Sequence, residues 1–406
     1  MTQEEFNKLS KGEQRHLSSE FRKTVHDGEI VFLNDKNAKS LTPQEAKEQL
    51  LKQRDELLAS LGFQIPNENK NDASNDYSRH EGLRKINMDE KMKSGIIGFA
   101  VGDALGVPVE FLNRGLLQKH PLKEMIGYGS HSVPEGTWSD DTSLTIAAMD
   151  SITENDGIDF EDIMYRFTEW VDYAKYTATD ELFDIGISTR KAILNFKKGE
   201  KATDCGTKGI NENGNGSLMR MLPFVYYLKT SNFSEEEKTM LINQASSLTH
   251  AHEISRLGCK IYADYVDLLL DGVDKVKALE LLKKVDYSKY YSADSIKAYK
   301  RILKDDLNSL DINQIKSSGF VVDSLEASLW CTLKNKNYED AVVTAVNLGD
   351  DTDTIGAITG SLNGIIYGEN NIPKRWLDKL KKKEYLEELS IEFVNTIKHE
   401  KIKKTL

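Results

Sequence analysis

Two short clusters of acidic and hydroxyl side chains constrain the fold of this chain more than any other feature. The first is Gly136-Thr137-Trp138-Ser139-Asp140-Asp141-Thr142, and the second, far along the chain, is Asp350-Asp351-Thr352-Asp353-Thr354. Adjacent carboxylates raise each other's pKa unless a counter-charge lies near, and oxygen ligands of this kind suit a hard divalent cation. If the clusters bind one metal centre together, the fold must join segments that are distant in sequence.

A simpler interpretation of the clusters is helix capping. Each cluster precedes an apolar run with helical spacing. Asp, Ser and Thr are favoured just before a helix, where the helix dipole also favours negative charge. Each cluster nevertheless carries an extra carboxylate beyond what a cap needs, and the chain has two such clusters. We therefore expect them to bind Mg²⁺ or a similar hard ion as well as to cap their helices.

The spacing of apolar residues predicts an all-helical body. Residues 160–171, 254–268 and 355–365 place apolar side chains three or four positions apart, on one face of a helix. Residues 95–106 form an apolar run with glycine at four positions, and such spacing lets a helix approach its neighbours closely. Convincing strand alternation is not found, and no repeat of 20–50 residues stands out.

The N-terminal part of the chain differs from this body in composition. A capping box at Thr42-Pro43-Gln44-Glu45 predicts a helix that ends at Gly62. Residues 1–65 are therefore expected to form a small helical extension. Residues 66–87 are largely polar, as in a linker. The remaining residues, 88–406, form the predicted helical domain.

Net charge and cysteine content exclude several classes of partner. The 406-residue chain carries a net charge of −11, and its Lys-rich stretch, residues 379–404, also contains Glu and Leu, as a solvated helix does. A nucleic-acid-binding surface is therefore not expected. No run of about 18 apolar residues predicts a membrane span. Three isolated cysteines favour a reduced, cytoplasmic protein.

A turn rich in glycine and asparagine, Asn213-Gly214-Asn215-Gly216-Ser217, runs into a predicted helix that contains Leu218, Met221 and Val225. Free backbone N–H groups at such a helix start would suit a phosphate. A plain turn with a helix cap explains the same pattern equally well.

Six motifs occur together in one order along the chain. They are Gly102-Asp103-Ala104-Leu105-Gly106 with Glu110, Gly136-Thr137-Trp138-Ser139-Asp140-Asp141-Thr142, Asp184-Ile185-Gly186, Asn215-Gly216-Ser217-Leu218-Met219-Arg220, Thr249-His250-Ala251-His252, and Gly349-Asp350-Asp351-Thr352-Asp353-Thr354-Ile355-Gly356. Each motif alone is weak. The ordered series, from about Met92 to Tyr367, resembles the ADP-ribosylglycohydrolase family.

The resemblance implies an all-α fold around a binuclear Mg²⁺ centre, with Mn²⁺ as an alternative. By position in the motifs, the metal ligands would be Ser139, Asp140, Asp141, Asp351, Asp353 and Thr354. Many members of the family have threonine where this chain has Ser139, and others have glycine where it has Asp350. A serine hydroxyl can still bind a metal, and Asp350 would add a carboxylate around the ligands.

For catalysis, the resemblance and the chemistry of glycosidic bonds point to a carboxylate outside the ligand set. Cleavage at the anomeric carbon of ADP-ribose passes through an oxocarbenium-like state and needs proton transfer. Glu110, which follows the glycine-rich run, is the first choice for this acid/base, and Asp184 is the second. Without the resemblance, Glu110 would be taken for an ordinary exposed residue at a helix end.

The resemblance also implies substrate-binding residues. The turn Asn215-Gly216-Ser217 would bind the ribose or the pyrophosphate. His250 would support the cleft from nearby, since Mg²⁺ prefers oxygen ligands to imidazole. Tyr128 would either stack on the adenine or fill space.

The implied function is hydrolytic removal of ADP-ribose from a modified protein, with arginine as the first choice of linkage. Serine-linked ADP-ribose, O-acetyl-ADP-ribose and a modified nucleic acid are alternative substrates. A third hypothesis is an immunity-type protein whose N-terminal region, residues 1–87, occludes an ADP-ribosyltransferase toxin; a helical accessory domain is the alternative for the same residues. A Mg²⁺-dependent phosphatase is disfavoured because no phosphoryl-accepting motif accompanies the carboxylates.

Overall fold

The computed structural model describes the backbone of residues 86–403 and the side chains of residues 86–398. This part of the chain is all-α, as predicted. It contains no β-strand, only two isolated bridges, between Thr207 and His250 and between Gly214 and Phe320. The predicted N-terminal helix and all of the predicted linker except residues 86–87 lie outside the described residues, so the domain boundaries remain a prediction.

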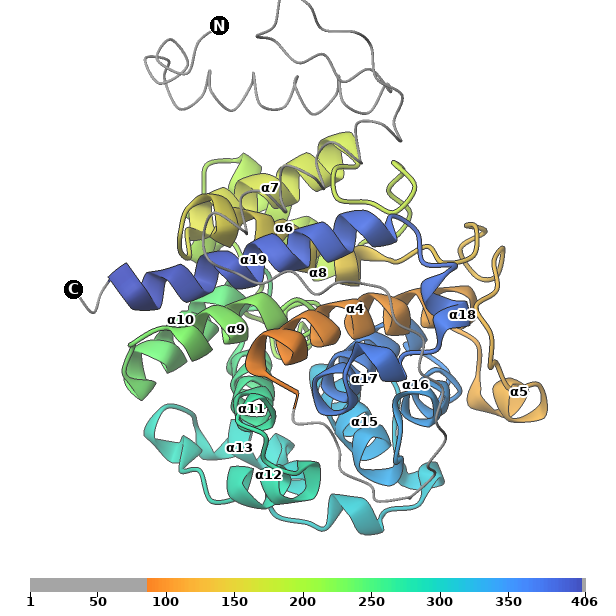
Figure 1. Ribbon diagram of the computed structural model, residues 1–406. Coiled ribbons are helices and arrows are strands. Elements are labelled where there is room, and N and C mark those ends of the chain that lie inside the picture. Colours follow the sequence, from red (N-terminus) through yellow and green to blue (C-terminus); the bar gives the residue numbers. More distant parts are fainter. Residues whose placement is uncertain (1–85, 404–406) are drawn as a thin grey trace, which may run out of the picture. The chain divides into compact units, whose positions relative to one another are not determined.

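The described chain folds into helices joined by turns (Figure 1). The α-helices are α4 (Met88–Gly106), α5 (Arg114–Lys119), α6 (Asp140–Glu154), α7 (Phe160–Tyr173), α8 (Ile187–Lys197), α9 (Leu222–Thr230), α10 (Glu235–Ser247), α11 (Glu253–Leu270), α12 (Lys275–Leu282), α13 (Ala293–Ala298), α14 (Lys300–Leu303), α15 (Val321–Lys334), α16 (Tyr338–Val346), α17 (Thr352–Tyr367), α18 (Lys374–Leu377) and α19 (Lys383–Lys403). The short 3₁₀ helices are η1 (Val107–Val109), η2 (Ala202–Asp204), η3 (Tyr287–Lys289), η4 (Leu307–Ser309), η5 (Ile312–Gln314) and η6 (Glu369–Asn371).

The three helices predicted from apolar spacing are confirmed as α7, α11 and α17. Local signals define the ends of α7. It begins after Asp159, whose carboxylate accepts hydrogen bonds from the amides of Glu161 and Asp162, and it ends at Ala174 in a left-handed conformation. A cap at one end and an apolar face along the length are therefore enough to specify this helix.

Helices α4 and α17 pack against each other at the centre of the described helices (Figure 1). A Cβ atom added at Gly102 would lie 2.1 Å from the carbonyl oxygen of Gly356, and one added at Gly98 would lie 2.5 Å from that of Gly360. Backbone therefore contacts backbone along the antiparallel pair. This confirms the close approach that the glycine spacing in residues 95–106 predicts.

The antiparallel arrangement places the second acidic cluster beside the end of α4. The hydroxyl of Thr352, the first residue of α17, donates a 2.8 Å hydrogen bond to the carbonyl oxygen of Gly106, the last residue of α4. η1 then carries the chain to Glu110. Carboxylate oxygens of Glu110, Asp351 and Asp353 consequently lie within 4.8 Å of one another.

Residues 88–109, which comprise α4 and η1, are long and apolar enough to cross a membrane by length and composition, the only such segment among the described residues. No membrane span was predicted from the sequence. In the protein 94% of its apolar window is buried. Packing against α17 and other helices accounts for this apolar character.

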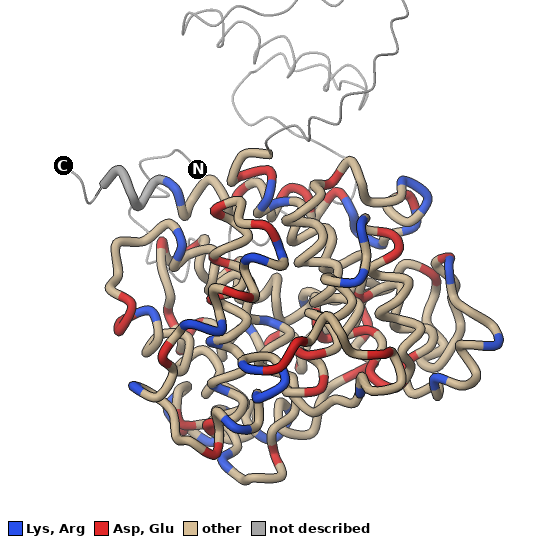
Figure 2. The backbone as a smooth tube through the Cα atoms, turned by 90° about the horizontal axis from the view of Figure 1, so that it is seen from below, with Lys and Arg blue, Asp and Glu red and all other residues tan. Residues whose placement is uncertain are grey.

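The C-terminal stretch that mixes Lys, Glu and Leu forms α19. Leu386, Phe393 and Ile397 are buried, and α19 packs on α4, α6 and α9. Figure 2 shows lysine and arginine dispersed among aspartate and glutamate along the described backbone. One face of α19 thus packs on the central helices, whereas the sequence predicted only a solvated helix.

One predicted helix start is wrong. The sequence predicts a helix directly after the glycine-rich turn, but residues 216–220 form further turns and α9 begins at Leu222. Pro223 lies in the first turn of α9, where its fixed φ and missing N–H favour a helix start. The free N–H groups of a helix N-terminus are therefore not at the glycine-rich turn.

Candidate active site

The first acidic cluster forms the N-terminus of α6. Ser139 is the N-cap, and Asp140 and Asp141 occupy the first turn, so the predicted capping is confirmed. Both carboxylates are also buried, which capping does not require. The Asp103 carboxylate, on α4, accepts hydrogen bonds from the amides of Ser139 (2.9 Å) and Thr142 (3.1 Å) and from the Thr142 hydroxyl (2.6 Å).

Asp103 is a site residue that the sequence analysis did not single out. It is fully buried, and burial raises the pKa of its carboxyl to about 6 despite the hydrogen bonds it accepts. The available signal was a single carboxylate inside the apolar run of residues 95–106. A charge in such a run is costly unless it has a fixed partner, and here the partner is the N-terminus of α6.

The second acidic cluster forms the N-terminus of α17. Asp351 is the N-cap residue, but its carboxylate makes no capping hydrogen bond. It instead accepts a 2.6 Å hydrogen bond from the side-chain amide of Asn215. The hydroxyl of Thr354 donates a 3.2 Å hydrogen bond to the carboxylate of Asp141. This contact joins the two clusters, so the structure brings together the two halves of the predicted metal site.

The joined cluster is electrostatically unfavourable without a cation. Burial raises the pKa of Asp140, Asp141 and Asp353 well above the usual range, and neighbouring carboxylates raise it further. One carboxylate oxygen of Asp141 is buried without a hydrogen-bond partner among the described residues. An oxygen-rich, buried and acidic set with an unsatisfied oxygen fits a divalent metal ion.

Glu110 lies beside this cluster and is buried. Glu110 is only 6% exposed, so the alternative interpretation, that it is an ordinary exposed residue at a helix end, is wrong. Its carboxylate forms a hydrogen bond with the ring Nε2 of His131, while the Ser130 hydroxyl donates a 2.5 Å hydrogen bond to its backbone carbonyl. Burial raises the pKa of Glu110 to about 7. A carboxyl in this range can exchange a proton near neutral pH.

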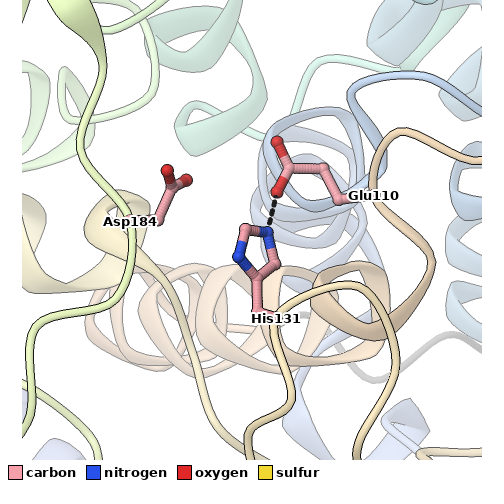
Figure 3. A group of neighbouring side chains, drawn as sticks. All are labelled: Glu110, His131 and Asp184. Carbon is pink, nitrogen blue, oxygen red and sulfur yellow. Dashed lines mark hydrogen bonds and ion pairs between the residues drawn. The ribbon is translucent and has the colours of Figure 1, made fainter.

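Asp184 faces Glu110 from the loop that precedes α8 (Figure 3). Its negative charge is among the influences that raise the pKa of Glu110 and of Asp140, and the amide of Gly186 donates a hydrogen bond to Asp140. The structure therefore brings both predicted acid/base residues to one place. His131 lies between them in Figure 3 and was missed in the sequence, where it stands in a loop without a motif.

The turn Asn215-Gly216-Ser217 is only partly directed at the acidic centre. The Asn215 side-chain amide donates to Ser324 as well as to Asp351. The hydroxyl of Ser217, in contrast, is fully buried and bonds Ser246 (2.9 Å) and Cys259 (3.4 Å). The structure thus brings Asn215 to one half of the predicted metal site and places the Ser217 side chain in the core.

His250 packs behind this turn. A Cβ atom added at Gly216 would lie 2.8 Å from its ring. Its Nδ1 pairs with the Thr249 hydroxyl at 2.9 Å, and burial lowers its pKa to about 3, so the ring is neutral. Its support role remains a prediction. Tyr128 is 74% exposed with a φ of +59°, and the structure does not bring it into the buried cluster.

Comparison with known proteins agrees with these features. Residues 84–402 match the family model described as ADP-ribosylglycohydrolase. ADP-ribosylarginine hydrolase Tri1 of Serratia proteamaculans is 30% identical over 304 residues, which cover 74% of this chain and 78% of that protein. The ADP-ribosyl-(dinitrogen reductase) glycohydrolase of Rhodospirillum rubrum is 27% identical over 293 residues, 72% of this chain and 90% of that protein.

A solved structure named as an ADP-ribosylglycohydrolase-related protein complex has the same fold. It superimposes with a TM-score of 0.64 at 28% identity and covers 76% of this chain and 98% of that one.

Proposed function

Because the chain belongs to the ADP-ribosylglycohydrolase family and is a glycosidic-bond hydrolase, we propose that it removes ADP-ribose from modified arginine side chains of proteins. The arginine linkage is supported by the two relatives named ADP-ribosylarginine hydrolase Tri1, from Serratia proteamaculans and Pseudomonas putida. The substrate would be an ADP-ribosylated protein, and the products would be free ADP-ribose and the unmodified arginine.

One observation carries this proposal. The N-termini of α6 and α17 meet through Thr354 and Asp141, and Glu110 lies beside them without belonging to the predicted ligand set. A metal site next to a separate protonatable carboxyl supplies both elements that hydrolysis of a glycoside needs.

We assign the metal ligands to Ser139, Asp140, Asp141, Asp351, Asp353 and Thr354. Two Mg²⁺ ions, or Mn²⁺ in their place, would supply positive charge for the ribose hydroxyls and for the attacking water. The oxygen-only donor set supports a hard ion of this kind.

The protein's own residues perform the proton transfer. Cleavage of the bond between the anomeric carbon and the arginine nitrogen leaves the electron pair on that nitrogen, and water adds to the carbon. One proton must leave the water and one must reach the departing nitrogen. Glu110 holds or releases a proton near neutral pH because burial raises its pKa to about 7. His131 keeps the Glu110 carboxylate in place through their hydrogen bond.

The activity is tested with an arginine-ADP-ribosylated protein and Mg²⁺, and free ADP-ribose is measured. We expect release by the wild type, no release by Asp351→Ala, and a loss of about 10²–10⁴-fold for Glu110→Gln. Asp340→Ala is the matched control, since Asp340 is an exposed acidic residue in the first turn of α16. Absence of release from every linkage by metal-loaded wild type would refute the hydrolase assignment.

The linkage is tested separately. The same assay is run with serine-linked ADP-ribose and with O-acetyl-ADP-ribose, and the three kcat/KM values are compared. Faster cleavage of either alternative would show that arginine is the wrong linkage and leave the hydrolase assignment intact. A modified nucleic acid serves as a fourth substrate in the same comparison.

The family match covers residues 84–402. We propose separately that the N-terminal region, which lies outside this match, binds and occludes an ADP-ribosyltransferase toxin. Removal of residues 1–80 should keep hydrolysis but abolish stoichiometric inhibition of such a toxin. Equal inhibition by the full chain and by the shortened protein would contradict the proposed toxin binding.

Three free, buried cysteines support the proposed cytoplasmic location.

A further inference from the structure

The negative charge around the site exceeds what two divalent ions neutralise. Seven carboxylates influence one another there, namely Asp103, Glu110, Asp140, Asp141, Asp184, Asp351 and Asp353. Four of them belong to the predicted ligand set and would be balanced by two Mg²⁺ ions. Asp103 is stabilised by the hydrogen bonds it accepts at the N-terminus of α6. Glu110 and Asp184 remain, and the His131 ring pairs with Glu110, which raises the pKa of His131.

Glu110 and Asp184 share a space with His131. One carboxylate oxygen from each acid and one ring nitrogen of His131 all lie within 4.8 Å of one another. Figure 3 shows the three side chains around this common space, from three different segments of the chain. A metal held at about 2.0–2.2 Å from each donor would replace the hydrogen bond between Glu110 and His131, whose donor atoms must move apart to admit the ion.

The donor set differs in chemistry from the predicted Mg²⁺ ligands. An imidazole with two carboxylates suits a borderline cation such as Zn²⁺, whereas the other site offers only oxygen. The His131 ring packs between Phe111 and Phe183, with ring centroids 5.8 and 5.2 Å away. These aromatic contacts hold the ring in place. His131 and Asp184 are only half-buried, so the site is accessible to an ion from solvent.

We propose that Glu110, His131 and Asp184 bind a borderline divalent cation of the Zn²⁺ class at a site next to the Mg²⁺ ligands, and that its occupation stops hydrolysis. Zn²⁺ bound at this site would coordinate the carboxylate oxygens of Glu110 and Asp184, so these oxygens could no longer transfer protons. The binding half of the proposal stands on geometry and charge alone. The inhibitory half rests on the proposed function, because it requires Glu110 and Asp184 to serve as acid/base.

Binding is tested with Zn²⁺ by calorimetry on the full chain in excess Mg²⁺. We expect about one equivalent of Zn²⁺ to bind the wild type, at least about tenfold weaker binding by His131→Asn, and unchanged binding by His120→Asn. His120 is an exposed histidine and controls for loss of any imidazole. Asp351→Asn should retain Zn²⁺, because Asp351 belongs to the other site.

Two results would overturn the proposal: Zn²⁺ affinity unchanged in His131→Asn, or Zn²⁺ binding lost in Asp351→Asn but kept in His131→Asn. X-ray absorption at the zinc edge of the wild type is independent of any variant's folding. It should show an imidazole nitrogen at about 2.0 Å, and an all-oxygen shell would refute the site.

Hydrolysis is measured separately from binding. Micromolar Zn²⁺ should inhibit the Mg²⁺-loaded wild type with the same midpoint as the binding curve. Zn²⁺ that binds through His131 without slowing hydrolysis would refute the inhibitory half alone. A protein that binds Zn²⁺ at this site but hydrolyses no substrate would leave the site standing while the proposed function fails.

Discussion

At the scale of single residues, Asp103 shows how one buried carboxylate fixes half of the site. It connects α4 to the first turn of α6 and accepts hydrogen bonds from the amides of Ser139 and Thr142. Those residues flank Asp140 and Asp141. The position of the two predicted ligands therefore depends on Asp103, which need not contact the metal itself. In other metalloproteins, hydrogen bonds to the ligands orient them in the same way.

Replacement of Asp103 by alanine should weaken both folding and metal binding. Two amides and a hydroxyl lose their acceptor, and a buried unsatisfied donor costs about 1–3 kcal/mol. We expect a loss of about 2–3 kcal/mol in the free energy of unfolding and a 10–100-fold weaker Mg²⁺ affinity, measured by urea denaturation and calorimetry. Asp159→Ala is the control, because Asp159 is the exposed N-cap of α7. It should cost about 1 kcal/mol without a change in Mg²⁺ affinity; unchanged affinity in Asp103→Ala would contradict the positioning role.

At the scale of secondary-structure elements, the contact between α4 and α17 sets the distance between the site's components. Glu110 follows α4 through η1, and Asp351 and Asp353 begin α17. Because backbone meets backbone along the glycines of the two helices, no side chain separates the helix axes. Any change that separates the helices should also separate Glu110 from the carboxylates of α17.

Substitution of Gly102 by alanine tests this contact. In an unconstrained helix the change would stabilise by about 1 kcal/mol. Here the added Cβ would lie 2.1 Å from the carbonyl oxygen of Gly356, so we expect a loss of about 1–3 kcal/mol from overpacking and reduced hydrolysis. Gly115→Ala, with its nearest neighbouring atom at 3.4 Å, should be neutral or slightly stabilising in a thermal melt. Equal melting temperatures of the two variants would show that the helices adjust without strain.

At the scale of the whole molecule, the site concentrates negative charge that only folding brings together. Asp141 and Asp351 are far apart in sequence, but in the folded protein burial raises the pKa of both, and the charge of Asp351 raises that of Asp141 further. In the unfolded chain these carboxyls have ordinary pKa values. Stability of the metal-free protein must therefore depend on pH.

Glu110 allows the sign of this dependence to be measured. Burial raises its pKa from 4.5 to about 7, so between these values the folded state binds more protons than the unfolded state. Its contribution to stability is full below pH 4.5 and is lost as the pH rises through about 7. In the presence of EDTA, the unfolding free energy of the wild type minus that of Glu110→Gln should fall from about pH 5 to about pH 8. Glu181→Gln, at an exposed glutamate, is the matched control for the substitution itself. A constant difference for Glu110→Gln would contradict the raised pKa.

Much of this architecture was predictable from sequence because its causes are local. The spacing that defines α7, α11 and α17 involves residues three or four positions apart, and the capping of α6 at Ser139 involves adjacent residues. The glycines of α4 likewise predicted that another helix packs closely against α4, but they did not identify that helix. The start of α9 was misplaced because the glycine-rich turn makes tertiary contacts with Gly319 and Val321 in place of starting a helix.

Local sequence patterns specified an all-helical body, several of its helices and the acidic clusters that begin two of them, as well as the order of the motifs. Contacts between distant segments established that Asp103 holds the end of α6, that Asn215 donates to Asp351, and that His131 pairs with Glu110. The physical reason is the distance along the sequence between the residues that interact. Helix formation and capping depend on neighbours along the chain, whereas burial, charge compensation and ligand geometry depend on segments that meet only when α4 and α17 pack together.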